Sequence, residues 1–111
     1  MKVTCQKMGS VNVIVPDGPL NEDIATAFRG AADGPLASPS PRLVISLAAV
    51  PYIDSHGLEM LLDYVGQLRE RNQPLKLAAL PATCREILYL TDLSGEFELF
   101  DDVQDAVRSY L

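Results

Sequence analysis

The stretch Val-Pro-Tyr-Ile-Asp-Ser-His-Gly-Leu, residues 50–58, joins two segments with different hydrophobic patterns. Residues 43–47, just before it, form an apolar run with the composition of a strand that is covered on both faces. After it, apolar residues recur at helical spacing, at Leu58, Leu61, Leu62, Val65 and Leu68. The pattern predicts a buried strand followed by an amphipathic helix, with Asp54 and Ser55 at the junction where the helix begins.

The part of the chain before this junction contains three predicted elements. Residues 3–7 and 11–15 have the composition of two short strands joined by a tight turn. Asn21 is a suitable N-cap for a helix over residues 22–32. The proline- and glycine-rich segment 33–41 is predicted to be a flexible loop.

From residue 43 onward, strands and helices alternate. The helix that begins at Ser55 is predicted to end near Asn72, ahead of Pro74. The later elements are a strand at 75–80, a helix from Pro81 to about Ser94, a strand at 97–100, and a last helix capped by Asp101 or Asp102. This order is typical of an α/β fold. We predict one domain over residues 1–111, with a mostly parallel mixed sheet of about five strands and about four helices mainly on one side.

Composition limits the possible functions. The chain has 15 acidic and 9 basic residues and a net charge of −6, which opposes binding to nucleic acid or to an anionic membrane surface. The longest nearly apolar run, residues 43–53, is too short to span a bilayer and is interrupted by serine and proline. The first residues contain no apolar signal-peptide core. We therefore expect a cytoplasmic protein that neither binds nucleic acid nor inserts into a membrane.

The inventory of metal-binding and nucleophilic residues is small. The two cysteines, Cys5 and Cys84, are far apart in the sequence and belong to no CxxC motif, and His56 is the single histidine. A zinc site would need all three residues and a carboxylate to converge. We expect two free thiols, no metal and no cofactor.

Several segments carry a family resemblance. Residues 43–58, Leu-Val-Ile-Ser-Leu-Ala-Ala-Val-Pro-Tyr-Ile-Asp-Ser-His-Gly-Leu, resemble the central signature of the STAS domain. This family includes sulfate-transporter tails and bacterial anti-sigma factor antagonists. Residues 75–80, 85–93 and 97–107 resemble its later strands and helices. The chain departs from the family pattern at three positions: His56 replaces a frequent Ser, Thr or Ala, Ser46 a frequent acidic or amide residue, and Asp92 a frequent glycine.

The resemblance implies a non-catalytic module that switches partners. In such systems the antagonist is phosphorylated on the residue that follows the aspartate, which is Ser55 in this chain. The unphosphorylated form binds an anti-sigma factor with serine-kinase activity and so releases the sigma factor. A serine phosphatase returns the antagonist to the unphosphorylated form.

The residues themselves leave two roles open for Ser55. A serine at a helix start can simply cap the helix, which contributes about 1 kcal/mol. It can also carry a phosphate, because the free N–H groups and partial positive charge of a helix start accommodate negative charge. Asp54 beside it could orient the hydroxyl or compete with it as the cap.

The start of this helix is also the predicted partner-binding surface. Met60 and Tyr64 lie four residues apart on a stripe separate from the leucines, and are expected to be half-buried at the rim of the surface. Gly57 is expected to permit close approach of a partner or of a neighbouring loop, or simply to pack. The complete predicted set is Asp54, Ser55, His56, Gly57, Met60 and Tyr64.

Two other functions compete with this hypothesis. A STAS-type accessory or scaffold subunit of a transport or sensory complex would use the same surface without a phosphate cycle. A small enzyme would need Cys5, Cys84 or Ser55 as its nucleophile, and the sequence offers neither a phosphate-binding loop nor a convincing base. Ser55 and His56 are adjacent, so on a helix they point about 100° apart and do not suit a nucleophile–base pair.

Overall fold

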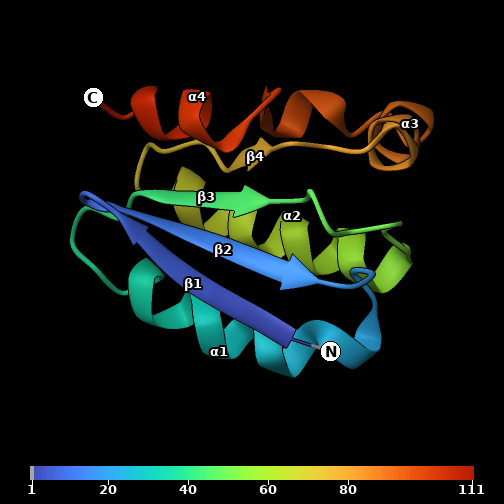
Figure 1. Cartoon of the computed structure of the whole chain (residues 1–111), viewed down its shortest axis with the longest axis horizontal. Helices are drawn as coiled ribbons and strands as arrows, with labels where there is room; N and C mark the ends of the chain where they lie inside the picture. Colours follow the sequence, from blue (N-terminus) through green and yellow to red (C-terminus); the bar gives the residue numbers. More distant parts are fainter. Residues whose placement is uncertain (1) are drawn as a thin grey trace.

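A computed structural model describes residues 2–111 and contains one five-stranded sheet (Figure 1). The strands lie in sequence order, and their bounds are β1 Lys2–Met8, β2 Val11–Asp17, β3 Leu43–Ser46, β4 Lys76–Ala78 and β5 Glu98–Phe100. The β1–β2 pair is antiparallel and every later pair is parallel. The predicted mixed sheet with an antiparallel edge is confirmed.

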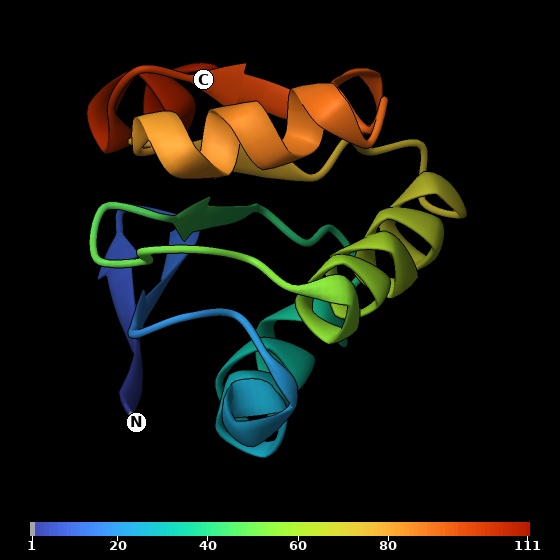
Figure 2. The same ribbon diagram turned by 90° about the vertical axis from the view of Figure 1, so that its right-hand side faces the viewer.

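Four α-helices flank the sheet: α1 Ala25–Leu36, α2 Ser55–Arg69, α3 Ala82–Leu90 and α4 Val103–Arg108. The first three each connect one parallel strand to its neighbour, always moving across the sheet in the same direction. Right-handed crossovers of this kind must lie on one face. Helix α4 follows the last strand and is free of that constraint, and it lies apart from α1 and α2 (Figure 2).

The core is divided between the two faces of the sheet. The neighbours Val44 and Ile45 on β3 point to opposite faces, as strand geometry requires. Ile45 belongs to the larger cluster, which also contains the buried side chains of α1, α2 and α3. Val44 belongs to the smaller cluster under α4, around Ala106. The sheet is therefore covered on both faces, which explains the unbroken apolar composition of β3.

Two contacts hold the second face together. The Tyr110 hydroxyl accepts a hydrogen bond from the Leu43 N–H at 3.0 Å and donates one to the Leu43 carbonyl at 2.9 Å. The ammonium of Lys76, only 6% exposed, pairs with Glu98 at 2.7 Å and lies 4.6 Å from the centre of the Tyr110 ring. Because both contacts join the end of the chain to the sheet, they fix α4 in place.

The segment after Asn21 differs from its prediction. The Asn21 side chain accepts hydrogen bonds from the backbone of Asp23 and Ile24, but it caps a short 3₁₀ turn, η1, at Glu22–Ile24. Helix α1 then continues to Leu36, with Pro35 in its last turn, so the predicted loop at 33–36 is wrong. Leu36 is buried in the main core, and this burial outweighs the local cost of the proline.

Helix α3 is shorter than predicted, because it ends at Leu90 and is followed by a separate 3₁₀ turn, η2, at Ser94–Glu96. Asp92 has φ = +58°, the left-handed conformation that commonly ends a helix. Glycine adopts this conformation without a Cβ penalty, which gives a physical reason for the frequent glycine in the family pattern. Aspartate is among the few other residues that tolerate it.

Candidate functional site

The candidate site lies where the parallel strands end. The carboxyl ends of β2, β3 and β4 meet at one edge of the sheet, a common position for binding sites in α/β folds. Segment 18–21, after β2, pairs with segment 47–54, after β3. The hydrogen bonds run from Gly18 N to Ala49 O (3.2 Å), from Leu20 N to Tyr52 O (3.1 Å) and from Asp54 N to Leu20 O (3.1 Å). We call these two paired segments the site platform.

Gly57 locks α2 onto this platform. A Cβ atom at residue 57 would overlap the carbonyl oxygen of Leu20 and would lie 2.9 Å from Cγ2 of Ile53. Such contacts are too close for any side chain, so only glycine fits between the helix and the platform. Of the roles left open for Gly57, the close approach of a neighbouring loop is confirmed. Because the residue is buried, its prediction as part of a partner-binding surface is wrong.

Cys84 supports the platform from the other side. Its buried thiol, on α3, donates a hydrogen bond to the Val50 carbonyl at 3.3 Å. Burial raises the pKa of the Cys84 thiol, which opposes formation of the thiolate. The contact indicates a structural role for Cys84 and does not favour the nucleophile considered from sequence.

The helix cap is Asp54, and Ser55 is the first residue of the helix. Asp54 has extended backbone angles, and its Oδ1 accepts a hydrogen bond from Gly57 N at 3.0 Å. Ser55 is exposed, and in residues 2–111 its hydroxyl makes no hydrogen bond to another protein group. The interpretation of Ser55 as the cap is therefore wrong, whereas competition by Asp54 for that role is confirmed.

His56 is the next exposed residue. Its Nδ1 lies 3.9 Å from Oδ2 of Asp54, and the two side chains are 58% and 40% exposed. The Asp54 carboxylate therefore has two neighbours, the backbone of α2 at one oxygen and the imidazole at the other. Asp54, Ser55 and His56 lie together at the surface, as predicted.

Met60 and Tyr64 do not lie at this surface. They are 3% and 0% exposed, so their prediction as a half-buried rim is wrong. Since Gly57 faces the platform, residues three and seven positions further along the helix face the core as well. Leu58 and Leu62, which the sequence pattern assigned to the core, are only partly buried. The helix is rotated relative to the prediction.

Tyr64 instead joins α2 to α1. Its hydroxyl donates a hydrogen bond to Oδ1 of Asp33 at 3.0 Å, and its ring centre lies 5.5 Å from that of Phe28. Burial, together with the Asp33 hydrogen bond, raises the pKa of Tyr64. These contacts assign Tyr64 to the helix–helix interface and not to partner binding.

Sequence reasoning missed Tyr52. This tyrosine is 44% exposed, in the platform only three residues before Ser55. Its backbone carbonyl is held by Leu20, while Pro51, Ala48 and Ala49 beside it are also exposed. An aromatic residue just before a predicted helix start was the available signal. It was hidden because the whole segment reads as one apolar run.

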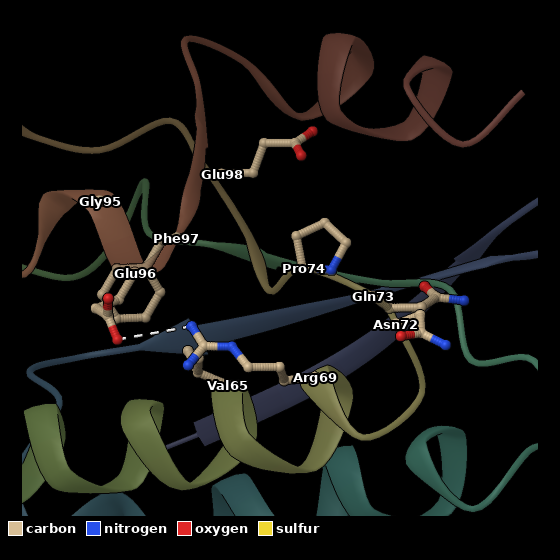
Figure 3. Close-up of a pocket in the computed structure, with 9 residues that line it drawn as sticks. All are labelled: Val65, Arg69, Asn72, Gln73, Pro74, Gly95, Glu96, Phe97 and Glu98. Atoms are coloured by element: carbon tan, nitrogen blue, oxygen red, sulfur yellow. Dashed lines mark ion pairs between the residues drawn. The ribbon is translucent and has the colours of Figure 1, made fainter.

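A cavity of about 470 Å³ lies at the opposite end of α2 (Figure 3). Figure 3 shows Arg69 extending toward Glu96, and their closest charged atoms are 3.6 Å apart. The cavity is lined by Val65, Arg69, Asn72, Gln73, Pro74, Gly95, Glu96, Phe97 and Glu98. None of the predicted site residues lines it.

Two properties of residues 2–111 bear on the class of site. No three His, Cys, Asp or Glu side chains in this part of the chain gather into a group that could hold a metal ion. None of its helices is both long enough and apolar enough to cross a membrane.

The structure of residues 2–111 is thus a small α/β domain with a mixed five-stranded sheet and an exposed serine at the start of α2. The model of the STAS domain matches residues 2–106, and the chain belongs to that family. Comparison with curated protein sequences gave no match.

Solved structures share this fold. A candidate anti-sigma factor antagonist from Thermotoga maritima superposes with a TM-score of 0.86 at 19% identity, over 96% of this chain and 92% of the other. An anti-sigma factor antagonist from Mycobacterium paratuberculosis gives 0.78 at 25% identity, over 97% and 92%. The murine Slc26a9 anion transporter gives 0.75 at 17% identity, over 94% of this chain but 18% of the transporter.

Proposed function

We propose that this protein is an anti-sigma factor antagonist, a cytoplasmic module that binds its partner in a phosphorylation-dependent manner. The unphosphorylated form binds an anti-sigma factor with serine-kinase activity and releases a sigma factor, and a serine phosphatase resets the switch. Support comes from membership of the STAS family and from the 25% identity to the mycobacterial antagonist over nearly the whole chain. The proposed phosphorylation site is Ser55.

The exposure of Ser55, free of any capping role, is the observation that carries this proposal. In the proposed step, its Oγ attacks the γ-phosphorus of ATP bound by the kinase partner. A bond forms between Oγ and phosphorus, the bond to the leaving ADP breaks, and the hydroxyl proton is lost to a base. Since Asp54 makes the cap, the hydroxyl can react without loss of any hydrogen bond that holds α2.

A phosphate on Ser55 would change the surface while preserving the fold. It adds about −1.5 to −2 charges at neutral pH. The helix start tolerates this charge, and the platform is held by backbone hydrogen bonds that the phosphate does not touch. The added charge would lie beside the Asp54 carboxylate. A partner that packs closely here would have to desolvate both anions, and its affinity would fall.

Tyr52 takes the place of Met60 and Tyr64 in the proposed contact surface, beside Asp54, Ser55 and His56. Exposed tyrosines contribute strongly to interfaces because they bury a large area at low entropic cost. We expect Tyr52→Ala to weaken the complex at least about 10-fold, about 1.4 kcal/mol. The free energy of unfolding should change by less than about 1 kcal/mol, because the Tyr52 carbonyl, which bonds to Leu20 in the platform, is retained in the variant.

Tyr89→Ala is the matched control for this prediction. It removes a tyrosine that is 76% exposed on α3 and lies outside the proposed surface. Titration calorimetry against the captured partner, with urea unfolding of each variant, gives both quantities. Equal binding by Tyr52→Ala and the unsubstituted protein would move the interface away from the platform.

The first experiment is to capture partners from the cell that makes this protein, with the Ser55→Ala variant as bait. The captured protein is then incubated with the unsubstituted chain and ATP, and phosphate is located by mass spectrometry. A phosphate on Ser55 supports the proposal. A bound partner that leaves Ser55 unmodified would favour the accessory or scaffold function, in which the same fold serves a larger assembly.

A further inference from the structure

The surroundings of Ser55 hold very little positive charge. The chain contains no Lys or Arg between Lys7 and Arg29, and none between Arg42 and Arg69. These two intervals include the whole site platform and the first three turns of α2. The charged residues they contribute are all acidic, and are Asp17, Glu22, Asp23, Asp54, Glu59 and Asp63.

Basic residues on the neighbouring elements lie opposite, or form ion pairs with, acidic residues other than Asp54. Lys2 on β1 lies opposite Asp17 in the strand register. Arg85 on α3 pairs with Asp101 at 3.0 Å. Arg29 on α1 faces Asp63, two turns along α2 from Ser55. Within residues 2–111, His56 is therefore the side chain next to Ser55 that can become positive.

His56 follows Ser55 in the chain, and both side chains are exposed at the start of α2. The imidazole Nδ1 is already 3.9 Å from Oδ2 of Asp54, so the ring lies on the side of the helix start where the carboxylate is exposed. Ser55 lies between these two residues in the chain, and its hydroxyl is free. A phosphate attached there would lie next to one fixed anion and one titratable cation.

We propose that the protonated His56 imidazole interacts electrostatically with a phosphate on Ser55, and that this interaction makes the phosphorylated state of the site sensitive to pH. This inference rests on the proposed modification of Ser55. A protonated imidazole offsets the repulsion between the phosphate and Asp54, whereas a neutral imidazole leaves two anions side by side. The phosphorylated form is therefore stabilised relative to the unphosphorylated form when His56 is protonated, and loses that advantage as the pH rises.

The test needs no kinase, because phosphoserine can be incorporated at residue 55 during translation. As His56 is the single histidine, its ring protons give an unambiguous proton NMR titration. We expect the midpoint of that titration to lie at least about half a pH unit higher in the phosphoserine protein than in the unmodified one, as expected for a nearby dianion at a screened surface. The Ser55→Asp variant should shift it in the same direction by a smaller amount.

A second measurement follows from the thermodynamic linkage between the titration of His56 and the second ionisation of the phosphoserine. If His56 stabilises the dianionic phosphate, the second ionisation of phosphoserine, followed by phosphorus NMR, must move to higher pH in a His56→Gln variant. Glu59→Gln, which alters an exposed acid one turn further along α2, is the matched control. Superimposable titrations of His56 in the modified and unmodified chains would overturn the inference. Failure to find a kinase would instead count against the proposed function alone.

Discussion

The two ends of helix α2 are built in opposite ways. At the amino end, Gly57 packs directly on the backbone of Leu20, and Asp54 caps the helix. At the carboxyl end, Gly66 has open space around it, and the last turn borders a cavity bridged by the ion pair of Arg69 and Glu96. The first turn is fixed by a direct backbone contact, whereas the last turn packs through the side chains of Val65 and Leu68 and borders an open cavity. A modification that must change a surface without unfolding it belongs at the fixed end.

The strongest test of this contrast substitutes the two glycines of α2. Gly57→Ala would force a methyl group against backbone, and we expect a loss of about 3 kcal/mol or more in the free energy of unfolding. Gly66→Ala adds the same methyl group in open space and should stabilise the helix by about 0.5–1 kcal/mol. Urea unfolding measures both. Equal effects of the two substitutions would show that the amino end is not locked.

A second prediction distinguishes the contributions of the Asp54 and Ser55 side chains to the stability of α2. Asp54→Ala removes the cap and should cost about 1 kcal/mol, whereas Ser55→Ala should cost at most a few tenths, since its hydroxyl holds nothing. Asp54→Ser retains a capping oxygen and should recover most of the loss. Thermal unfolding of the three variants checks this order. A larger cost for Ser55→Ala than for Asp54→Ala would return the capping role to the serine.

The smallest expected effect is at the carboxyl end. Asn72 ends the turn after α2 with φ = +58°, a conformation that glycine adopts without a Cβ penalty. Asn72→Gly should therefore change the free energy of unfolding by no more than about 0.5 kcal/mol, because asparagine already tolerates this conformation. Asn72→Ala should lose about 1 kcal/mol. Indistinguishable Gly and Ala variants would contradict the left-handed turn.

The periodicity of the sequence was sufficient for the fold. The order of strands and helices, the antiparallel edge and the junction at Asp54 and Ser55 all follow from patterns of two and 3.6 residues. Helix ends were less predictable. Proline and glycine near residue 35 indicated a loop, yet the burial of Leu36 keeps that segment helical. Local propensity cannot report such tertiary contacts.

The site was only partly predictable for a similar reason. Asp54, Ser55 and His56 were found because a helix start is a local feature. Met60 and Tyr64 were misplaced because the rotation of α2 is set by the contact between Gly57 and Leu20, which are distant in the sequence. With seven apolar residues spread over two adjoining stripes, periodicity alone could not tell which stripe faced the core.

The measurement that tests the central claim most directly compares the binding affinities of two variants, one with a neutral and one with a negatively charged residue at position 55. Both Ser55→Ala and Ser55→Asp should retain the fold, since Asp54 supplies the cap. Calorimetry against the captured partner should show that Ser55→Ala binds like the unsubstituted protein. It should also show that Ser55→Asp binds at least about 10-fold more weakly, a difference of about 1.4 kcal/mol. Equal affinities of the two variants, with no phosphate found on Ser55, would contradict the switch and leave a binding module of constant affinity.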